Sequence, residues 1–296
     1  MEINSSTLEK LFTGYKASFA KGFTGTASVW PKIAMKVTST TRLETYAWLG
    51  QFPKMREWLG DRVVNMLLVK AMELKNKDFE STIAVPRNDI EDDQFGIYAP
   101  VMEEMGRGAA ELPDELVFAV LAGGFTTLCY DGQMFFDTDH PVKKGADVVS
   151  VANTDGGNGA PWYLLDTSRA VRPFIYQERR AANLVSKTNE TDDNVFWRKE
   201  YIYGVDSRGA AGYGFWQLAW GSKQPLDSAR FAAAMAAMQG YRGDEDRLLG
   251  IRPTVLVVGP DNELAARKLI KATTLENGES NPWKDAVELI VSPWVA

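Results

Sequence analysis

The fold is decided by a stretch that opens with Leu43-Glu-Thr-Tyr-Ala-Trp-Leu-Gly-Gln-Phe-Pro53 and ends with Tyr130-Asp-Gly-Gln-Met-Phe-Phe-Asp-Thr-Asp-His-Pro141. Between these two segments, the hydrophobic pattern predicts a long β-hairpin and then one long helix. Such an order is typical of a subunit that reaches across its neighbours. It is not typical of a chain built around a pocket that excludes water.

The predicted hairpin spans residues 62–86. Its first arm is the apolar run Val63–Val69, its turn is the polar segment Lys75–Asp78, and its second arm alternates over Phe79–Val85. A hairpin this long would expose unpaired strand edges if it stood alone. We therefore expect it to lie on a neighbouring copy of the chain.

The remaining elements follow from periodicity and from capping and turn residues. Helices are expected at residues 5–21, 98–122, 226–239 and 263–273. Strands are expected at residues 162–166, 173–177, 194–204, 212–220, 253–259 and 287–291. We expect Ser5 or Ser6 to cap the first helix, Pro113 to kink or restart the second, Gly123-Gly124 to end it, and residues 143–160 to form a surface loop.

The helix at residues 5–21 has one apolar face, formed by Leu8, Leu11, Phe12, Tyr15 and Phe19. Loop signals follow it at Gly22, at Gly25 and in the Ser/Thr cluster at residues 38–41. Two interpretations remain open at this point. The helix either docks on another subunit or packs on its own domain.

Composition limits the possible functions. The chain has 296 residues, of which 45% are apolar, enough for one large domain or two modest ones. Its net charge is -6 and it has no Lys/Arg run longer than two, which disfavours specific nucleic-acid binding. One Cys and one His exclude an internal disulfide and a Cys/His zinc cluster, and the single Cys fits a reducing compartment. No secretion signal and no transmembrane helix are expected.

His140 is the one candidate general base of its type. Asp137 and Asp139 lie beside it and Asp131 is close in sequence, so a hydrolase that uses His140 with Asp137 or Asp139 is one hypothesis. The Gly-x-Ser-x-Gly elbow that would supply a serine is missing. The same aspartates could bind a divalent cation, although the calcium-loop pattern is absent. We favour turn-capping aspartates and a structural histidine.

Other chemical motifs have simpler explanations. Asp92-Asp93 could be the paired carboxylates of a glycosidase, but a helix start accounts for them. Neither Gly212-Tyr-Gly214 nor Asp155–Gly159 completes a phosphate-binding loop. We interpret the first as a strand with close backbone approach and the second as a loop tip. Cys129 has no cationic neighbour in sequence, so a buried apolar role is expected.

Several residues are candidates for contact between subunits. Trp48 and Trp58 flank a segment punctuated by Gly and Pro, and interfaces favour tryptophan. The full set of candidates is Leu8, Phe12, Tyr15, Phe19, Trp48, Trp58, Lys75, Asn76, Lys77 and Phe79.

The chain resembles the major head subunits of phage Mu and of Mu-like prophages. The resemblance is carried, in order along nearly the full length, by several motifs. They are Tyr46–Pro53, Glu57–Arg62, Phe79–Ile83, Glu91–Asp93, Gly96–Pro100, Met105–Arg107, Pro113–Leu116, Tyr130–Gln133, Phe135-Phe136, His140-Pro141, Trp162–Arg169, Ile175–Arg179, Tyr203–Val205, Gly214–Ala219, Arg252-Pro253 and Leu256–Val258.

The resemblance implies an α+β fold of the Hong Kong-97 capsid type. It assigns residues 1–42 to an N-terminal arm and 43–87 to an extended loop that contains the long hairpin. A peripheral domain with a spine helix would use residues 88–124 and parts of 160–224. An axial domain would use mainly 125–159 and 225–296. The strand–helix–strand unit at the C-terminus departs from the family pattern and predicts a rearranged tail.

The function implied is that of a structural protein of the virion. Hexamers and pentamers of the chain would form the icosahedral head of a tailed phage around packaged double-stranded DNA, assembled in the host cytoplasm. Scaffold, portal and decoration proteins are the implied partners, with weak non-specific contact to DNA, no membrane contact and no cofactor or metal. The alternatives are a nanocompartment shell of the same fold and the hydrolase above. Some shells of this fold are cross-linked through Lys and Asn, which we do not expect at Lys75–Lys77 because a polar turn accounts for them.

Overall fold

A computed structural model describes residues 4–46, 72–92, 94–144, 147–243, 246–275 and 278–295. Its helices are α1 (Ser5–Gly25), α2 (Arg87–Glu91), α3 (Ala99–Ala122), α4 (Asp193–Arg198), α5 (Ser228–Gln239) and α6 (Pro260–Lys271). Its strands are β1 (Ala34–Thr38), β2 (Leu43–Tyr46), β3 (Met72–Lys75), β4 (Lys77–Pro86), β5 (His140–Lys144), β6 (Asp147–Val151), β7 (Thr154–Gly157), β8 (Trp162–Leu165), β9 (Phe174–Lys187), β10 (Glu200–Tyr213), β11 (Ala219–Lys223), β12 (Arg242–Gly243), β13 (Arg247–Leu248), β14 (Val255–Val258) and β15 (Glu288–Val291). None of the described helices is long and apolar enough to cross a membrane.

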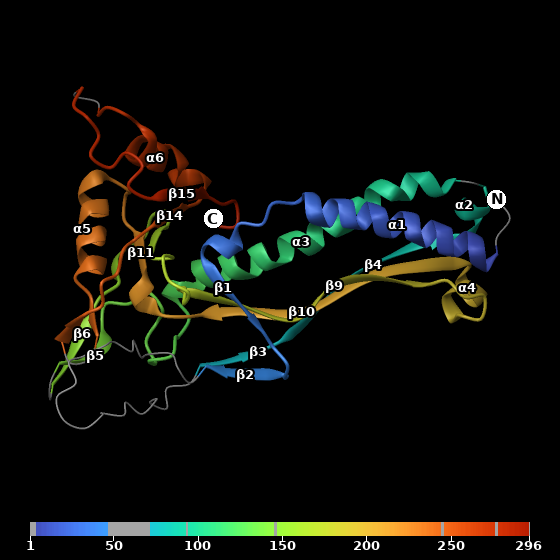
Figure 1. Ribbon diagram of the computed structural model, residues 1–296, viewed down its shortest axis with the longest axis horizontal. Helices are drawn as coiled ribbons and strands as arrows, with labels where there is room; N and C mark the ends of the chain where they lie inside the picture. Colours follow the sequence, from blue (N-terminus) through green and yellow to red (C-terminus); the bar gives the residue numbers. More distant parts are fainter. Residues whose placement is uncertain are drawn as a thin grey trace.

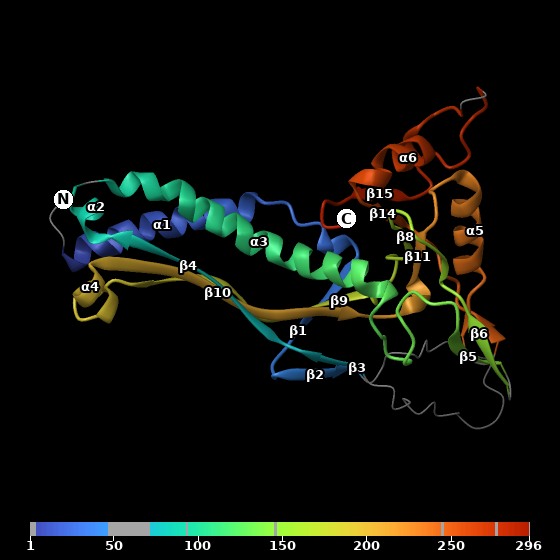
Figure 2. The ribbon, with the colours of Figure 1, turned by 180° about the vertical axis from the view of Figure 1, so that it is seen from behind.

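One half of the molecule is an elongated body in which two helices lie on one face of a twisted sheet (Figures 1 and 2). The strand order of this sheet is β1-β9-β10-β4, and β9 and β10 are its two long central strands. Helix α3 packs on β9 and β10, and α1 runs along α3. The apolar stripe of α3, which includes Met102 and Met105, is buried beneath α1 and against the sheet.

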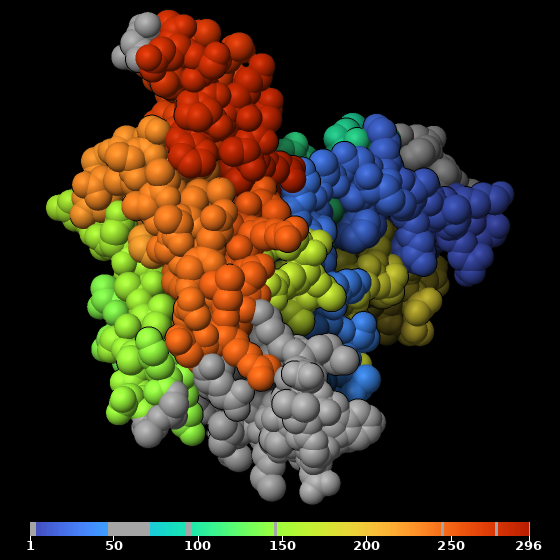
Figure 3. Space-filling view, turned by 60° about the vertical axis from the view of Figure 1, so that its left-hand side comes forward, coloured from blue at the N-terminus to red at the C-terminus, as the bar shows by residue number. Residues whose placement is uncertain are grey.

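The other half is a compact unit around a five-stranded sheet of order β15-β14-β8-β11-β7. Strands β8 and β14 are buried along their whole length, as expected for strands covered on both faces. Helices α5 and α6 flank this sheet (Figure 1), and residues coloured red form the top of the molecule in Figure 3. The largest apolar cluster of the described residues lies here and continues under the near end of α3.

Most long helices agree with the sequence predictions. Helix α3 covers the expected residues and ends at Gly123, and α5 lies within the expected range and is capped by Asp227, whose carboxylate accepts a hydrogen bond from the Arg230 amide. The unit β14–α6–β15 is the predicted strand–helix–strand, with its two strands parallel. One local prediction was wrong: Asn4, not Ser5 or Ser6, caps α1. Helix α3 continues through Pro113, so of the two predicted effects of this proline the restart does not occur.

The predicted hairpin at residues 62–86 is wrong in its pairing. Strand β3 pairs with β2, and β4 pairs with β10, so the two strands on either side of Asn76 never pair with each other. The segment Lys75–Asp78 is therefore a junction between two ladders and not a turn. Residues 62–71 of the predicted first arm lie outside the described residues.

Three further differences have one cause, which is that local pattern does not reveal distant strand partners. Residues 143–160, expected as a loop, hold β6, β7 and the end of β5. Residues 194–204, expected as one strand, begin as α4 and become β10 only at Glu200. Strands β1 and β2 were not predicted, and β1 owes its place to parallel pairing with β9.

Candidate functional site

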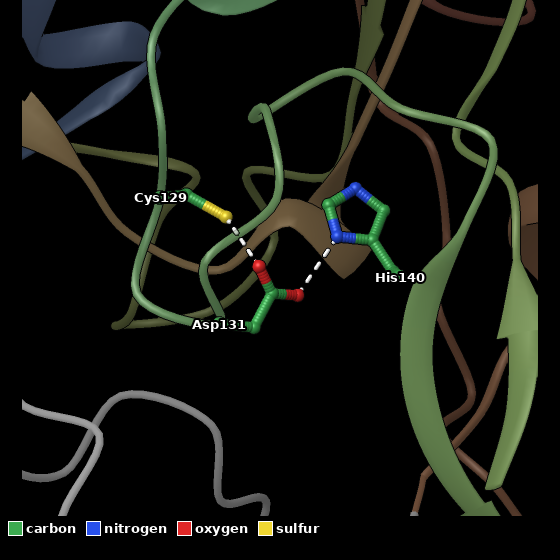
Figure 4. A group of neighbouring side chains, drawn as sticks. All are labelled: Cys129, Asp131 and His140. Carbon is green, nitrogen blue, oxygen red and sulfur yellow. Dashed lines mark hydrogen bonds and ion pairs between the residues drawn. The ribbon is translucent and has the colours of Figure 1, made fainter.

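The histidine singled out by the sequence lies at the start of β5 and is completely buried. Its Nδ1 lies 2.8 Å from Asp131 Oδ2, and its Nε2 lies 3.2 Å from Asn153 Oδ1. The ring stacks on Trp216 with 4.0 Å between centroids and 9° between planes. Figure 4 shows Asp131 between His140 and Cys129, and the Cys129 Sγ donates to the other Asp131 oxygen at 3.1 Å.

Both ring nitrogens of His140 face acceptors. The orientation of the Asn153 amide is fixed, because its Nδ2 donates to the Phe135 carbonyl at 2.8 Å and its Oδ1 accepts from the Asp137 amide at 2.8 Å. The Asp131 carboxylate can only accept, so Nδ1 of His140 is the atom that carries a proton toward it. Burial by itself would raise the pKa of Asp131, but the hydrogen bonds from His140 and Cys129 bring it below its usual value.

The cluster has the residue types of a metal site but not the arrangement. The ligand atoms of Cys129, Asp131 and His140 lie within 4.8 Å of one another. Each donor faces a different oxygen of Asp131, whereas metal ligands converge on one point. Burial and the Asp131 charge raise the pKa of the Cys129 thiol, which disfavours the thiolate that a metal would bind. The expectation that Cys129 is buried holds, but its role is polar.

Asp137 and Asp139 are not the hydrogen-bond partners of the His140 ring. The Asp137 carboxylate accepts from the amides of Met134 and Thr138, at 3.1 and 2.7 Å. A hydrogen bond with Asp137 raises the pKa of exposed Asp139. The predicted pairing of His140 with either residue is therefore wrong, and Asp131 takes that place. With no exposed ring atom, His140 cannot contact a substrate in this structure.

The contact candidates on the first helix are packed on their own subunit. Leu8 and Tyr15 are buried in a cluster with Met102 of α3 and Tyr203 of β10, and Phe12 stacks on Tyr203. Phe19 is buried in an adjoining cluster that includes Met105. Of the two interpretations left open by the sequence, the described subunit shows the second. A role for these residues between subunits stays a prediction and requires α1 to leave α3.

The remaining contact candidates differ in their exposure. Lys75 and Lys77 are exposed and Phe79 is half-buried, but Asn76 between the two lysines is 3% exposed. A buried Asn76 cannot serve as the exposed tip of a hairpin or as a cross-linking group. Trp48 and Trp58 lie outside the described residues. Contact between subunits through Lys75, Lys77 or Phe79 stays a prediction.

Sequence reasoning missed an exposed aromatic pair. Phe196 and Trp197 of α4 are 67% and 76% exposed and pack edge to face, with 4.8 Å between ring centroids. They lie at the end of the elongated body far from the five-stranded sheet (Figure 1). We assigned this segment to a strand, so the exposure of two neighbouring aromatic side chains on a short helix could not be anticipated.

Comparison with known proteins identifies the family. The family model described as the Mu-like prophage major head subunit gpT matches residues 8–295. The major capsid protein of Escherichia phage Mu is 42% identical over 305 residues, an alignment that covers 100% of both chains. The procapsid of bacteriophage JBD30 is similar with a TM-score of 0.88 and 43% identity, over 99% of this chain and 100% of that chain. The JBD30 capsid decorated with minor capsid protein trimers is similar with a TM-score of 0.77 and 33% identity, over 93% of each chain.

These matches run from one end of the chain to the other. The expected rearrangement of the C-terminal tail stays a prediction. The neighbouring capsid structures also bear out the α+β fold of the Hong Kong-97 type. The chain belongs to the family of Mu-like prophage major head subunits.

Proposed function

We propose that many copies of this chain assemble, as hexamers and pentamers, into the icosahedral head of a Mu-like tailed phage around packaged double-stranded DNA. The observation that carries the proposal is the end-to-end match to the head-subunit family. The elongated body adds physical support, because it presents an exposed aromatic pair at its far end.

The domain assignment is retained with one change. We assign the elongated sheet with α3 to the peripheral domain and the five-stranded sheet with α5 and α6 to the axial domain. The extended loop is narrowed to the β2–β3 ladder and residues 47–71, since β4 belongs to the sheet of the elongated body. The N-terminal arm of residues 1–42 includes α1, which packs on α3 in the isolated subunit.

The proposed partners are chiefly further copies of the chain. Scaffold and portal proteins are proposed for assembly in the host cytoplasm, and a decoration protein is supported by the minor capsid protein trimers on the JBD30 capsid. A net charge of -6 suits weak, non-specific contact with DNA, because DNA must slide into the shell without adhering.

We also propose that the chain has no enzymatic activity of its own. The hydrolase hypothesis required an accessible His140, and this residue is buried and paired with Asp131. The nanocompartment alternative is not favoured, because the family that matches residues 8–295 is one of phage head subunits.

Assembly is tested most directly by replacing residues 48–70 with a short Gly/Ser linker, which leaves the β2–β3 ladder in place. We expect wild-type chain, expressed with or without scaffold, to form shells or capsomer-sized oligomers by sedimentation and negative-stain microscopy. The linker variant should keep the melting temperature of the subunit and form no shells. Shells formed equally well by the linker variant would refute the role proposed for this segment.

A second expected result concerns Phe196 and Trp197. Replacing both with Ala should change the free energy of unfolding by no more than about 0.5 kcal/mol, because both side chains are exposed. We expect the yield of shells to fall, since aromatic side chains dominate many interfaces. The control is Leu264→Ala, which truncates an apolar side chain on α6 that is 70% exposed. Normal shell yield in the double variant would exclude a contact at this end.

A further inference from the structure

A buried amide joins the central sheet to the β2–β3 ladder. Gln177 lies near the start of β9, which has β1 on one side and β10 on the other, and it is fully buried. Its Oε1 accepts from the Tyr46 hydroxyl at 2.7 Å. Its Nε2 donates to Asn76 Oδ1 at 2.7 Å and to the Leu74 carbonyl at 3.1 Å. One side chain therefore contacts both strands of the ladder, at Tyr46 of β2 and Leu74 of β3.

Asn76 extends this connection to the turn that precedes β2. Its Nδ2 donates to Ser39 Oγ at 2.8 Å and to the Thr41 carbonyl at 2.9 Å. Its backbone amide donates to the Arg42 carbonyl at 3.1 Å, which adds one bond to the end of the ladder. Asn76 lies where the chain leaves the ladder and enters the sheet, since β3 ends at Lys75 and β4 begins after Asn76.

Both amides have only one possible orientation. The carbonyl groups of Leu74 and Thr41 can only accept hydrogen bonds, so the NH2 groups of Gln177 and Asn76 must face them. The remaining Asn76 oxygen then faces Gln177 Nε2. Rotation of either amide would place two acceptors or two donors in contact inside the protein.

The network reaches the surface at Glu44. Its Oε1 accepts from Ser39 Oγ at 2.8 Å and from the amides of Thr40 and Thr41 at 2.9 and 3.2 Å. These hydrogen bonds, the one from Ser39 first, lower the pKa of Glu44 to about 2, so the carboxylate is charged at neutral pH. The turn between β1 and β2 is thereby closed by a side chain of the ladder itself.

Packing supports the same placement independently. A Cβ atom on Gly212 of β10 would lie 3.1 Å from Leu74 Cδ1 and 3.5 Å from Met72 Cε. The absence of a side chain at Gly212 allows the apolar side of β3 to lie close to the backbone of β10. The ladder thus contacts the sheet through apolar atoms at Gly212 and through polar atoms at Gln177.

We propose that Gln177 and Asn76 are positioning residues for assembly, which fix the direction in which the β2–β3 ladder leaves the sheet. The inference deepens the proposed function and rests on it, because residues 47–71 begin and end at this ladder. A two-stranded ladder is marginal in water, so its direction depends on its contacts with the sheet. Apolar contacts tolerate a range of angles, whereas fully satisfied buried hydrogen bonds specify one.

The test variant is Gln177→Leu, which replaces the amide with an apolar side chain of similar size and removes all three side-chain hydrogen bonds of Gln177. In the unassembled subunit, we expect amide hydrogen exchange in β2 and β3 to accelerate by about tenfold or more, while exchange in β14 stays unchanged. Closed shells should become rare or misshapen in negative-stain images. A milder variant, Asn76→Ser, keeps a small polar group at the junction and should show the same pattern if Gln177→Leu folds poorly.

The matched control is Asn281→Leu. Asn281 is also a buried amide, and its Nδ2 donates to the carbonyls of Leu269 and Ala272 in the compact half, away from the ladder. It should lose stability to a similar degree and still form closed shells. Equal loss of shells in the control and in Gln177→Leu would show that the amides only contribute stability, which overturns the proposal.

Two other results would also overturn it. Unchanged exchange in β2 and β3 of Gln177→Leu would show that the amides do not hold the ladder. Accelerated exchange with normal shells would show that the direction of the ladder does not matter for assembly. Wild-type chain that forms no shells under any condition would refute the proposed function and the assembly role with it, while the exchange measurement still decides whether these amides hold the ladder.

Discussion

Replacing Gly106 with Ala is expected to separate α1 from α3. A Cβ atom at Gly106 would lie 2.1 Å from the Phe19 carbonyl oxygen, and one at Gly22 would lie 1.9 Å from the Glu103 carbonyl oxygen. The two helix backbones therefore touch at this crossing. A backbone cannot rotate away as a side chain can, so the helices must move apart. We expect the free energy of unfolding to fall by about 3 kcal/mol, the upper end of typical overpacking costs.

The same helix offers an internal control. Gly108 lies two positions further along α3, and a Cβ atom there would meet nothing within 4 Å. Gly108→Ala should therefore stabilise the subunit by about 0.5–1 kcal/mol, because Ala has the higher helix propensity. On α1, Gly14→Ala and Gly22→Ala form the equivalent pair, since Gly14 also faces open space. Urea unfolding measures the free energy of unfolding of each variant, which should fall for Gly106→Ala and Gly22→Ala and rise for Gly108→Ala and Gly14→Ala.

Limited proteolysis tests the consequence for α1. In the wild-type subunit α1 covers the clusters around Met102 and Met105, so cleavage within residues 4–25 should be slow. In Gly106→Ala it should be fast, and cleavage of the five-stranded sheet should be unchanged. Equal cleavage of α1 in Gly106→Ala and Gly108→Ala would contradict the close crossing. The result also decides how readily the candidates Leu8, Tyr15 and Phe19 could become available to a neighbouring subunit.

The second large effect is expected at the Asp131–His140 pair. Asp131→Asn keeps the shape of the side chain and removes the charge that accepts the hydrogen bonds from buried His140 and Cys129. A hydrogen bond to a charged group typically contributes about 1.5–3 kcal/mol, and Asp131 accepts two such bonds from side chains, so the loss would be a large part of the total stability of a domain. The matched control is Asp139→Asn, eight positions along the same segment, where the carboxyl is exposed. It should leave the melting temperature of the subunit close to that of wild type.

The pH dependence has a defined sign. The pKa of Asp131 is lower in the folded subunit than its usual value of about 3.9. Its contribution to stability is therefore complete above that value and is lost as the pH falls through the lower, folded-state pKa. Wild type should lose stability in this acidic range, and Asp131→Asn should lose less. If the free energy of unfolding fell equally steeply with decreasing pH in both proteins, Asp131 would not be the group responsible.

His140→Ala separates the structural role from the hydrolase hypothesis. The structural role predicts a large loss of subunit stability, because Asp131 would be left buried without its partner. The hydrolase hypothesis predicts a stable, assembling subunit that lacks an activity. Circular dichroism melting together with negative-stain images distinguishes the two results.

The sequence by itself determined the family and the elements that depend on local pattern. Local hydrophobic periodicity is enough to predict α3, α5 and the strand–helix–strand at the C-terminus. The structure has these elements where they were expected. Ordered motifs along the chain were sufficient to indicate the head-subunit family, which the comparisons confirm.

Only the tertiary structure decided which segments meet. Lys75–Asp78 has the composition of a turn, yet Asn76 is buried because Gln177, 101 residues away in sequence, supplies its hydrogen bond. Asp137 and Asp139 are closer to His140 in sequence, yet Asp131 is its partner. Strand pairing and buried polar contacts join residues distant in sequence, and their free energy depends on neighbours that no local pattern reveals.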